Sequence, residues 1–358
     1  MIESSCMRDC KLLNLLALLL IVTCLAGCEA LGFYTQAIGG QLHLLRHRES
    51  VEKILEDSQQ PPALQQRLAL IEKMLDFAEQ DLQLPVEKSY SSYVKLNQDF
   101  IVWNVFATER FSVEPVEWCY PIAGCASYRG YFKQTDAEKF AAKMENKGYD
   151  VYVGGVKAYS TLGWFNDPLL DTFVNFSEDR LAALLFHELA HKVLYVKDDT
   201  EFNESFASAV EQIGVQRWFE RHGQPQQFAR YQQRLEERAA FHGQVALLRD
   251  SLQSLYESSA EEGLLQAGRE KLYTEFTREF VQFQQHWQTA DRYALWLGRG
   301  DNNAKLLPVV AYNRWVPAFT QLVEENEFKL SDFYAECQQL AKQKKQQRED
   351  FLAKKALQ

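Results

Sequence analysis

The apolar residues between positions 34 and 83 recur at the three- and four-residue spacing that is typical of amphipathic helices. The pair Pro61–Pro62 interrupts this pattern, which therefore predicts two helices that serve as scaffold. Between positions 90 and 131 the pattern changes to short β-prone runs separated by turn residues, including 99–106 and 115–124. We expect a small sheet there.

Helical spacing returns at 135–148, where a glycine closes the segment, and a β-strand is expected directly after it at 150–156. A second helix is expected at 177–196, because Ser177 is a suitable N-cap and two acidic residues follow it. After a short polar turn, the pattern predicts a third helix at 201–222.

Beyond residue 223 the chain alternates long, polar-rich helices with short breaks, and it contains no repeat of fixed period. The whole pattern predicts an α+β fold that is mostly helical, with a small sheet next to the helix at 177–196 and additional helical scaffold. We expect an N-terminal helical segment at 28–89, an α+β core at 90–225 and a C-terminal helical region at 226–358.

Residues 1–27 have a different composition. Arg8 and Lys11 precede an apolar run at 12–22. The sequence Leu-Ala-Gly at 25–27 comes next and stands directly before Cys28. The apolar run is too short to span a bilayer comfortably. A charged start, a short apolar middle and small residues at the end are typical of a secretory signal peptide. The alternative is a buried N-terminal helix.

The Leu-Ala-Gly-Cys sequence resembles the lipobox of bacterial lipoproteins. The resemblance implies that the signal is cut before Cys28 and that the thiol of this residue carries diacylglycerol. Glu29 follows, where lipoproteins retained at the inner membrane usually have Asp, so we expect an outer-membrane protein that faces the periplasm. The membrane would then be a partner through the N-terminal lipid.

Composition excludes some functions. The chain has 358 residues, of which 46% are hydrophobic and 25% are charged, as expected of a globular protein. Its formal net charge of -10 argues against a general affinity for nucleic acid. We therefore expect no nucleic-acid partner.

Three of the seven cysteines would leave with the signal and Cys28 would be lipidated, which leaves Cys119, Cys125 and Cys337. In an oxidising periplasm, Cys119 and Cys125 could close a short disulfide loop. Two free buried thiols are the alternative. Zinc binding by this pair is less attractive, because no second Cys or His pair lies nearby at ligand spacing.

The segment Phe-His-Glu-Leu-Ala-His carries the candidate chemistry. On a helix, residues four apart share one face, so His187 and His191 can bind the same zinc ion. Glu188 stands next to the first histidine, where it can act on a water molecule at the ion. This H-E-x-x-H pattern is typical of metal-assisted peptide hydrolysis. The alternative is a pair of surface histidines without a metal.

A catalytic zinc site usually has three protein ligands. The metzincin pattern is excluded, because the chain has Leu194 and Lys197 where that pattern needs Gly and His. Glu204 lies 13 residues after His191, near the start of the third helix, so a helical hairpin would point it at the ion. Glu211 lies on the same face and could orient a ligand. The alternative for Glu204 is a solvated carboxylate.

The segment N-E-S-F-A at 203–207 is similar to the N-E-G-F-A segment that supplies the third zinc ligand in membrane alanyl-type aminopeptidases, although the gap from the second histidine is longer there. Three segments, at 118–132, 158–165 and 186–191, resemble the predicted aminopeptidase family of bacterial lipoproteins. This resemblance spans about 34–218 and continues more loosely to Tyr312. It implies a gluzincin-like zinc aminopeptidase.

In such an enzyme, zinc polarises the scissile carbonyl, and Glu188 takes a proton from water and passes it to the leaving amine. For the donor to the oxyanion, Tyr312 is the first candidate and His286 the second; a tyrosine in the core is the alternative for Tyr312. The strand at 150–156 occupies the place of an edge strand that pairs with substrate. The run at 158–165 contains no acid that could bind a free ammonium group.

The sequence therefore predicts a zinc-dependent peptidase that acts on a peptide or protein substrate, with aminopeptidase activity as the refinement implied by the resemblance. One alternative is a lipid-anchored assembly or chaperone-like protein with a non-catalytic zinc hairpin. The presence of Glu188 argues against it, because a structural zinc site needs no general base. Another alternative, an endopeptidase, would share all the catalytic residues.

Overall fold

The computed structural model describes residues 32–120, 124–158, 166–258, 261–287, 290–310 and 314–356. The expected signal peptide, the expected lipidation residue Cys28, the run at 159–165 and Tyr312 lie outside these ranges. Among the helices within them, none combines the length and the hydropathy needed to cross a membrane.

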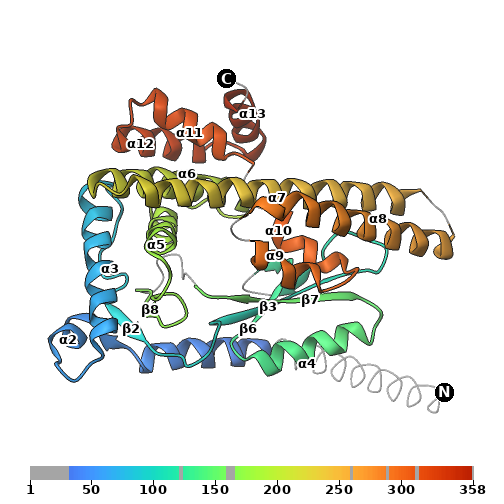
Figure 1. Ribbon diagram of the computed structural model, residues 1–358, viewed down its shortest axis with the longest axis horizontal. Helices are drawn as coiled ribbons and strands as arrows, with labels where there is room; N and C mark the ends of the chain where they lie inside the picture. Colours follow the sequence, from blue (N-terminus) through green and yellow to red (C-terminus); the bar gives the residue numbers. More distant parts are fainter. Residues whose placement is uncertain are drawn as a thin grey trace, which may run out of the picture.

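The described part of the chain is α+β and mostly helical, which confirms the predicted fold class (Figure 1). Residues 32–46 are helical. The helices that follow are α2 (Val51–Glu56), α3 (Pro62–Gln80), α4 (Gln134–Glu145), α5 (Glu178–Val193), α6 (Thr200–Arg221), α7 (Pro225–Glu257), α8 (Glu262–Phe283), α9 (Ala290–Leu297), α10 (Leu307–Val310), α11 (Val316–Glu325), α12 (Leu330–Ala341) and α13 (Lys345–Lys355), with the short 3-10 helices η1 (Gln284–His286) and η2 (Asn303–Leu306).

Helices α6 and α7 follow one another along the length of the molecule, and α8 returns beside α7 (Figure 1). Helix α5 packs against α6 on one side, and α11 packs against α6 on the side of the C-terminal helices (Figure 1). The α5–α6 pair, which carries the histidines and Glu204, is therefore enclosed by helices from both ends of the chain.

The strands form three small sheets. They are β1 (Glu49–Ser50), β2 (Ser92–Val94), β3 (Val102–Thr108), β4 (Trp118–Tyr120), β5 (Gly124–Ala126), β6 (Arg129–Tyr131), β7 (Asp150–Val156) and β8 (Leu169–Leu170). The sheet orders are β1-β2-β8, β6-β3-β7 and β4-β5. Strand β3 is antiparallel to both neighbours, with Trp103 opposite Tyr131 and Val105 opposite Val153, whereas β2 and β8 are parallel.

Several elements lie where the sequence predicted them. Strand β7 has the expected bounds, and α4 covers most of the helix expected at 135–148. Gly148 follows α4 with a φ of 88°, a conformation that glycine adopts without steric cost. Helix α5 ends at Val193 rather than near residue 196, because Leu194 is already extended with a φ of -151°.

Three hydrophobic clusters hold the elements together. The largest joins α3, α5 and α6 to the C-terminal helices, with Phe186, Phe206 and Phe319 fully buried in it. A second fills the space between α7, α8 and α9. A third lies between α4 and the β6-β3-β7 sheet. The sheet that shares the core of α5 is the short β1-β2-β8 sheet, whose two- and three-residue strands are too short to give a sequence pattern.

The domain boundaries at 89 and 225 stay predictions.

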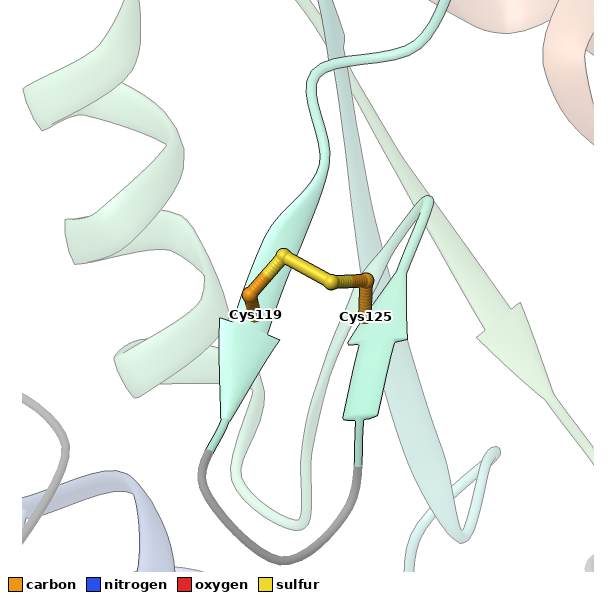
Figure 2. The surroundings of a disulfide bond; sticks show 2 residues. All are labelled: Cys119 and Cys125. Atoms are coloured by element: carbon orange, nitrogen blue, oxygen red, sulfur yellow. A yellow bond between two sulfur atoms is a disulfide. The ribbon is translucent and has the colours of Figure 1, made fainter.

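A disulfide joins Cys119 and Cys125 across the β4-β5 hairpin, the first of the three arrangements considered for this pair (Figure 2). Figure 2 shows the two side chains reaching toward each other from adjacent strands. Because both sulfur atoms are bonded to each other, neither is available as a thiolate for a metal. Cys337 is a free thiol buried in the core of the C-terminal helices.

A glycine allows α5 and α6 to approach closely. A Cβ atom on Gly214 would lie 2.7 Å from the ring of Phe186 and 2.8 Å from a methyl group of Leu82. Both neighbours are fully buried, so neither can move aside without disturbing the core. Helix α7 offers a matched position, because a Cβ on Gly243 would meet nothing within 4 Å.

We expect Gly214→Ala to lower the free energy of unfolding by about 1 to 3 kcal/mol, the usual cost of forcing extra volume into a packed core. Gly243→Ala is the control and should be neutral or stabilising by up to about 1 kcal/mol, because alanine favours helices over glycine. Urea unfolding followed by circular dichroism measures both changes. Equal stabilities of the two variants would contradict the tight α5–α6 packing.

Candidate metal centre

The α5–α6 hairpin is fixed at its turn. Asn203 accepts a hydrogen bond from the Val196 amide at 2.7 Å and donates one to the Val196 carbonyl at 2.8 Å. Asp199 is the N-cap of α6, where its carboxylate accepts from the Phe202 amide. The same carboxylate accepts a hydrogen bond from the Nε–H group of Arg348 at 3.0 Å. Since these groups are buried, they hold the turn in one conformation.

The hairpin is also tied at its open end. The indole of Trp218, near the end of α6, donates to the Glu178 carboxylate at the start of α5 over 2.9 Å. Helix α5 buries Phe186 and Leu189 on the face toward the core, and it leaves His187 and Glu188 half-buried on the neighbouring face. The amphipathic sequence of α5 thus determines which way the candidate ligands point.

Three candidate ligands converge between the two helices. The Nε2 atom of His187 lies 3.2 Å from one carboxylate oxygen of Glu204, and the Nε2 atom of His191 lies 3.5 Å from the other. One ligand atom from each residue falls within 4.8 Å of the others. The structure therefore brings together the three residues that the sequence singled out as metal ligands.

Glu211 supports this group from behind. Its Oε2 atom lies 3.1 Å from Nδ1 of His187, the nitrogen that faces away from Glu204. Its Oε1 atom accepts a hydrogen bond from the Tyr231 hydroxyl of α7 at 2.9 Å. A carboxylate in this position fixes the orientation of a ligating imidazole and directs its other nitrogen at a metal.

The protonation states fit a cation site. Burial lowers the pKa of His187, but its hydrogen bonds with Glu204 and Glu211 outweigh burial and raise the pKa to about 10. Burial, assisted by the neighbouring His187, lowers the pKa of His191 to about 4. Burial acts to raise the pKa values of Glu204 and Glu211, yet the hydrogen bonds from His187 bring both below the ordinary value.

In the protein alone, a proton on His187 thus sits between two carboxylates. A divalent cation would supply the same positive charge, and two imidazole nitrogens with one carboxylate oxygen form a donor set suited to zinc. The residues present therefore fit a zinc ion. His187, His191 and Glu204 would hold it, and Glu211 would orient His187.

A pocket of about 600 Å³ adjoins the group, between α5, α6 and α7. Glu188 lines it together with His187 and Glu204. A carboxylate beside the ligands and open to the pocket is placed to exchange protons with a bound substrate or water.

Other expected residues cannot be placed here. Tyr312 lies outside the described residues, and so does the side chain of His286. The structure adds two tyrosines that the sequence reasoning missed. The centre of the Tyr195 ring lies 6.3 Å from that of His191. Tyr128 lies close enough to Glu204 to interact with its charge. Tyr195 follows the end of α5 at Val193, so the helical spacing of the sequence does not predict its position.

The family model described as "Putative aminopeptidase" matches residues 32–352, which is most of the chain. The chain belongs to this family. No curated protein and no solved structure matches it. Membership of this family supports the general assignment of the protein as a peptidase.

For this member of the aminopeptidase family, we expect Glu211→Gln to weaken zinc binding about 10-fold to 100-fold, because the substitution removes the charge that orients His187. Competition with a chromogenic chelator measures the affinity. Glu220→Gln, at an exposed position on the same helix, is the matched control and should bind zinc like the wild type. An unchanged affinity in Glu211→Gln would mean that this carboxylate does not support the site.

Proposed function

We propose that the protein is a zinc-dependent peptidase with a gluzincin-like core, anchored at a bacterial membrane by a lipid on Cys28. The observation that carries this proposal is the convergence of His187, His191 and Glu204 within 4.8 Å, with Glu188 lining the adjoining pocket. The family match supports the peptidase part of the proposal. Aminopeptidase action is the refinement that the family description suggests.

A bound zinc ion would polarise the scissile carbonyl and make its water ligand more acidic. Glu188 would accept the proton of the attacking water and deliver it to the nitrogen of the leaving amine.

The negative charge on the carbonyl oxygen requires a hydrogen-bond donor. Tyr312 remains the donor proposed from sequence. Tyr195 and Tyr128 lie near the ligands in the described part of the chain, and their hydroxyl groups are further candidates for this role. Tyr195 is 50% exposed, so its hydroxyl could reach a substrate at the mouth of the site.

Strand β7 is proposed to pair with the substrate backbone. It lies at an edge of the β6-β3-β7 sheet. The side-chain amide of Asn302 donates a hydrogen bond to the Val151 carbonyl at 2.7 Å. This carbonyl, at the start of the strand, is therefore already paired within the protein. The part of β7 near Gly154 and Gly155 is the proposed substrate edge.

The proposal predicts that purified full-length protein carries one zinc ion per chain and cleaves peptides from a mixed library. Glu188→Gln should keep the metal and lose at least about 100-fold in activity, because a positioned general base contributes 100-fold or more. Glu236→Gln, an exposed position on α7, is the control and should behave like the wild type. Zinc without cleavage in the wild type would favour the non-catalytic hairpin, and the cut positions distinguish exopeptidase from endopeptidase action.

The anchor is tested separately. In cells supplied with a labelled fatty acid, the wild type should be labelled and recovered with membranes, whereas Cys28→Ser should be neither, because it lacks the thiol that would form the thioether. Cys24→Ser, within the expected signal peptide, should be labelled normally. Labelling that persists in Cys28→Ser would disprove this anchor.

A further inference from the structure

A second pocket, of about 900 Å³, lies at the open edge of strand β7. Its lining comes from β7, from the start of α4 and from α7 and α9. We call it the edge pocket, and six aromatic side chains form its walls: Phe100, Trp103, Tyr152, Phe241, Tyr293 and Trp296. The proposed chemistry uses the candidate metal centre and the backbone of β7, but it uses none of these side chains.

The free backbone groups of β7 open into the edge pocket. The side-chain amide of Asn302 binds the Val151 carbonyl, which therefore points away from β3. Because the backbone groups of successive residues alternate between the two sides of an antiparallel strand, those of Val153 and Gly155 point the same way as those of Val151. Both residues line the edge pocket, and no described residue outside the sheet forms a backbone hydrogen bond with either. A peptide that pairs with β7 would thus run along this pocket.

Aromatic packing holds the walls of the edge pocket in place. On the helical side, the ring centre of Phe241 lies 4.3 Å from that of Tyr293 and 5.0 Å from that of Trp296. On the side of the sheet, the ring centres of Phe100 and Trp103 are 6.1 Å apart. Phe241 is only 4% exposed and Trp103 only 6%, so these rings are fixed by their neighbours. Preformed aromatic walls of this kind favour a bulky apolar ligand group, above all an aromatic one.

The charged residues of the edge pocket do not favour a charged ligand. Asp99 and Glu138 are exposed acids in the lining, and Lys133 and Arg299 are exposed bases. The two signs are therefore balanced. Since exposed charges are also screened by water and salt, neither an acidic nor a basic side chain would gain much from this lining.

The edge pocket adjoins the pocket of the candidate metal centre. The Nζ atom of Lys157, directly after β7, lies 5.7 Å from the ring centre of Phe100 in the edge pocket. It lies 5.6 Å from the ring centre of Phe176, which lines the pocket at the metal centre. The two rings are therefore no more than about 11 Å apart, which is roughly the length of three residues of extended peptide. Helix α7 also joins the pockets, because Phe241 lines one and His242 lines the other.

We infer that the edge pocket binds a bulky, uncharged side chain of a peptide that pairs with β7, so that the protein selects substrates with an aromatic residue a few positions from the cleaved bond. This inference rests on the proposed function. It joins three features of the described residues: an unpaired strand edge, rigid aromatic walls beside it, and a short path to Glu188 and the candidate zinc ligands.

The test is calorimetric titration of full-length, zinc-loaded Glu188→Gln protein, which binds without cleaving. The ligands are seven-residue peptides of alanine and serine in which one position at a time carries phenylalanine. At one position or more, phenylalanine should strengthen binding about 10-fold to 100-fold, because its side chain leaves water for an apolar site. Glutamate or lysine at the same position should give no such gain.

A substitution that fills the edge pocket should remove this gain. Thr135 is exposed in the lining at the start of α4, and Thr135→Trp would occupy the space of the ligand side chain. Lys139→Trp is the matched control and should keep the gain, because this residue of the same helix lies outside the lining and its side chain is 79% exposed. Should Thr135→Trp fail to fold by circular dichroism, Arg299→Trp, at another exposed position in the lining, provides the same test.

Equal affinity for the peptides with and without phenylalanine would overturn the inference, and so would a gain that survives both tryptophan substitutions in the lining. An equal gain from glutamate or lysine would also overturn it. Wild-type cleavage without preference for phenylalanine, together with equal affinities, would leave the peptidase in place and remove the aromatic site. A gain that Thr135→Trp abolishes, without any cleavage by the wild type, would keep the aromatic site and refute the proposed peptidase.

Discussion

The candidate metal centre depends on how closely α5 and α6 pack. His187 and Glu204 lie on different helices, so the 3.2 Å between their atoms exists only while these helices keep their separation. Gly214 permits that separation because it adds no side chain against Phe186. Hydrogen bonds at both ends of the hairpin, from Asn203 and Trp218, then fix the register of one helix against the other.

Local sequence signals were sufficient for part of this structure. The spacing of apolar residues predicted α5, α6 and β7, and the fold class is confirmed. The H-E-x-x-H pattern and the distance to Glu204 depend on helical geometry and one short turn, so they could be read without knowing the rest of the fold. The structure places these residues together, while their role as zinc ligands stays a prediction.

Contacts between distant segments could not be read in this way. Tyr231 and Arg238 reach the centre from α7, and nothing in the periodicity of that helix distinguishes the stripe facing the pocket from its solvated faces. The short β1-β2-β8 sheet was missed for a related reason: its strands are held by tertiary contacts rather than by their own pattern.

The bond between Arg348 and Asp199 joins residues that are far apart in the chain. A ribosome makes the H-E-x-x-H helix long before it makes Arg348, so a nascent chain carries the histidines while the turn beside them still lacks its final partner. Only a chain translated as far as Arg348 can form that bond at the turn. A chain interrupted before Arg348 would therefore keep the histidine-bearing hairpin without the bond that locks its turn.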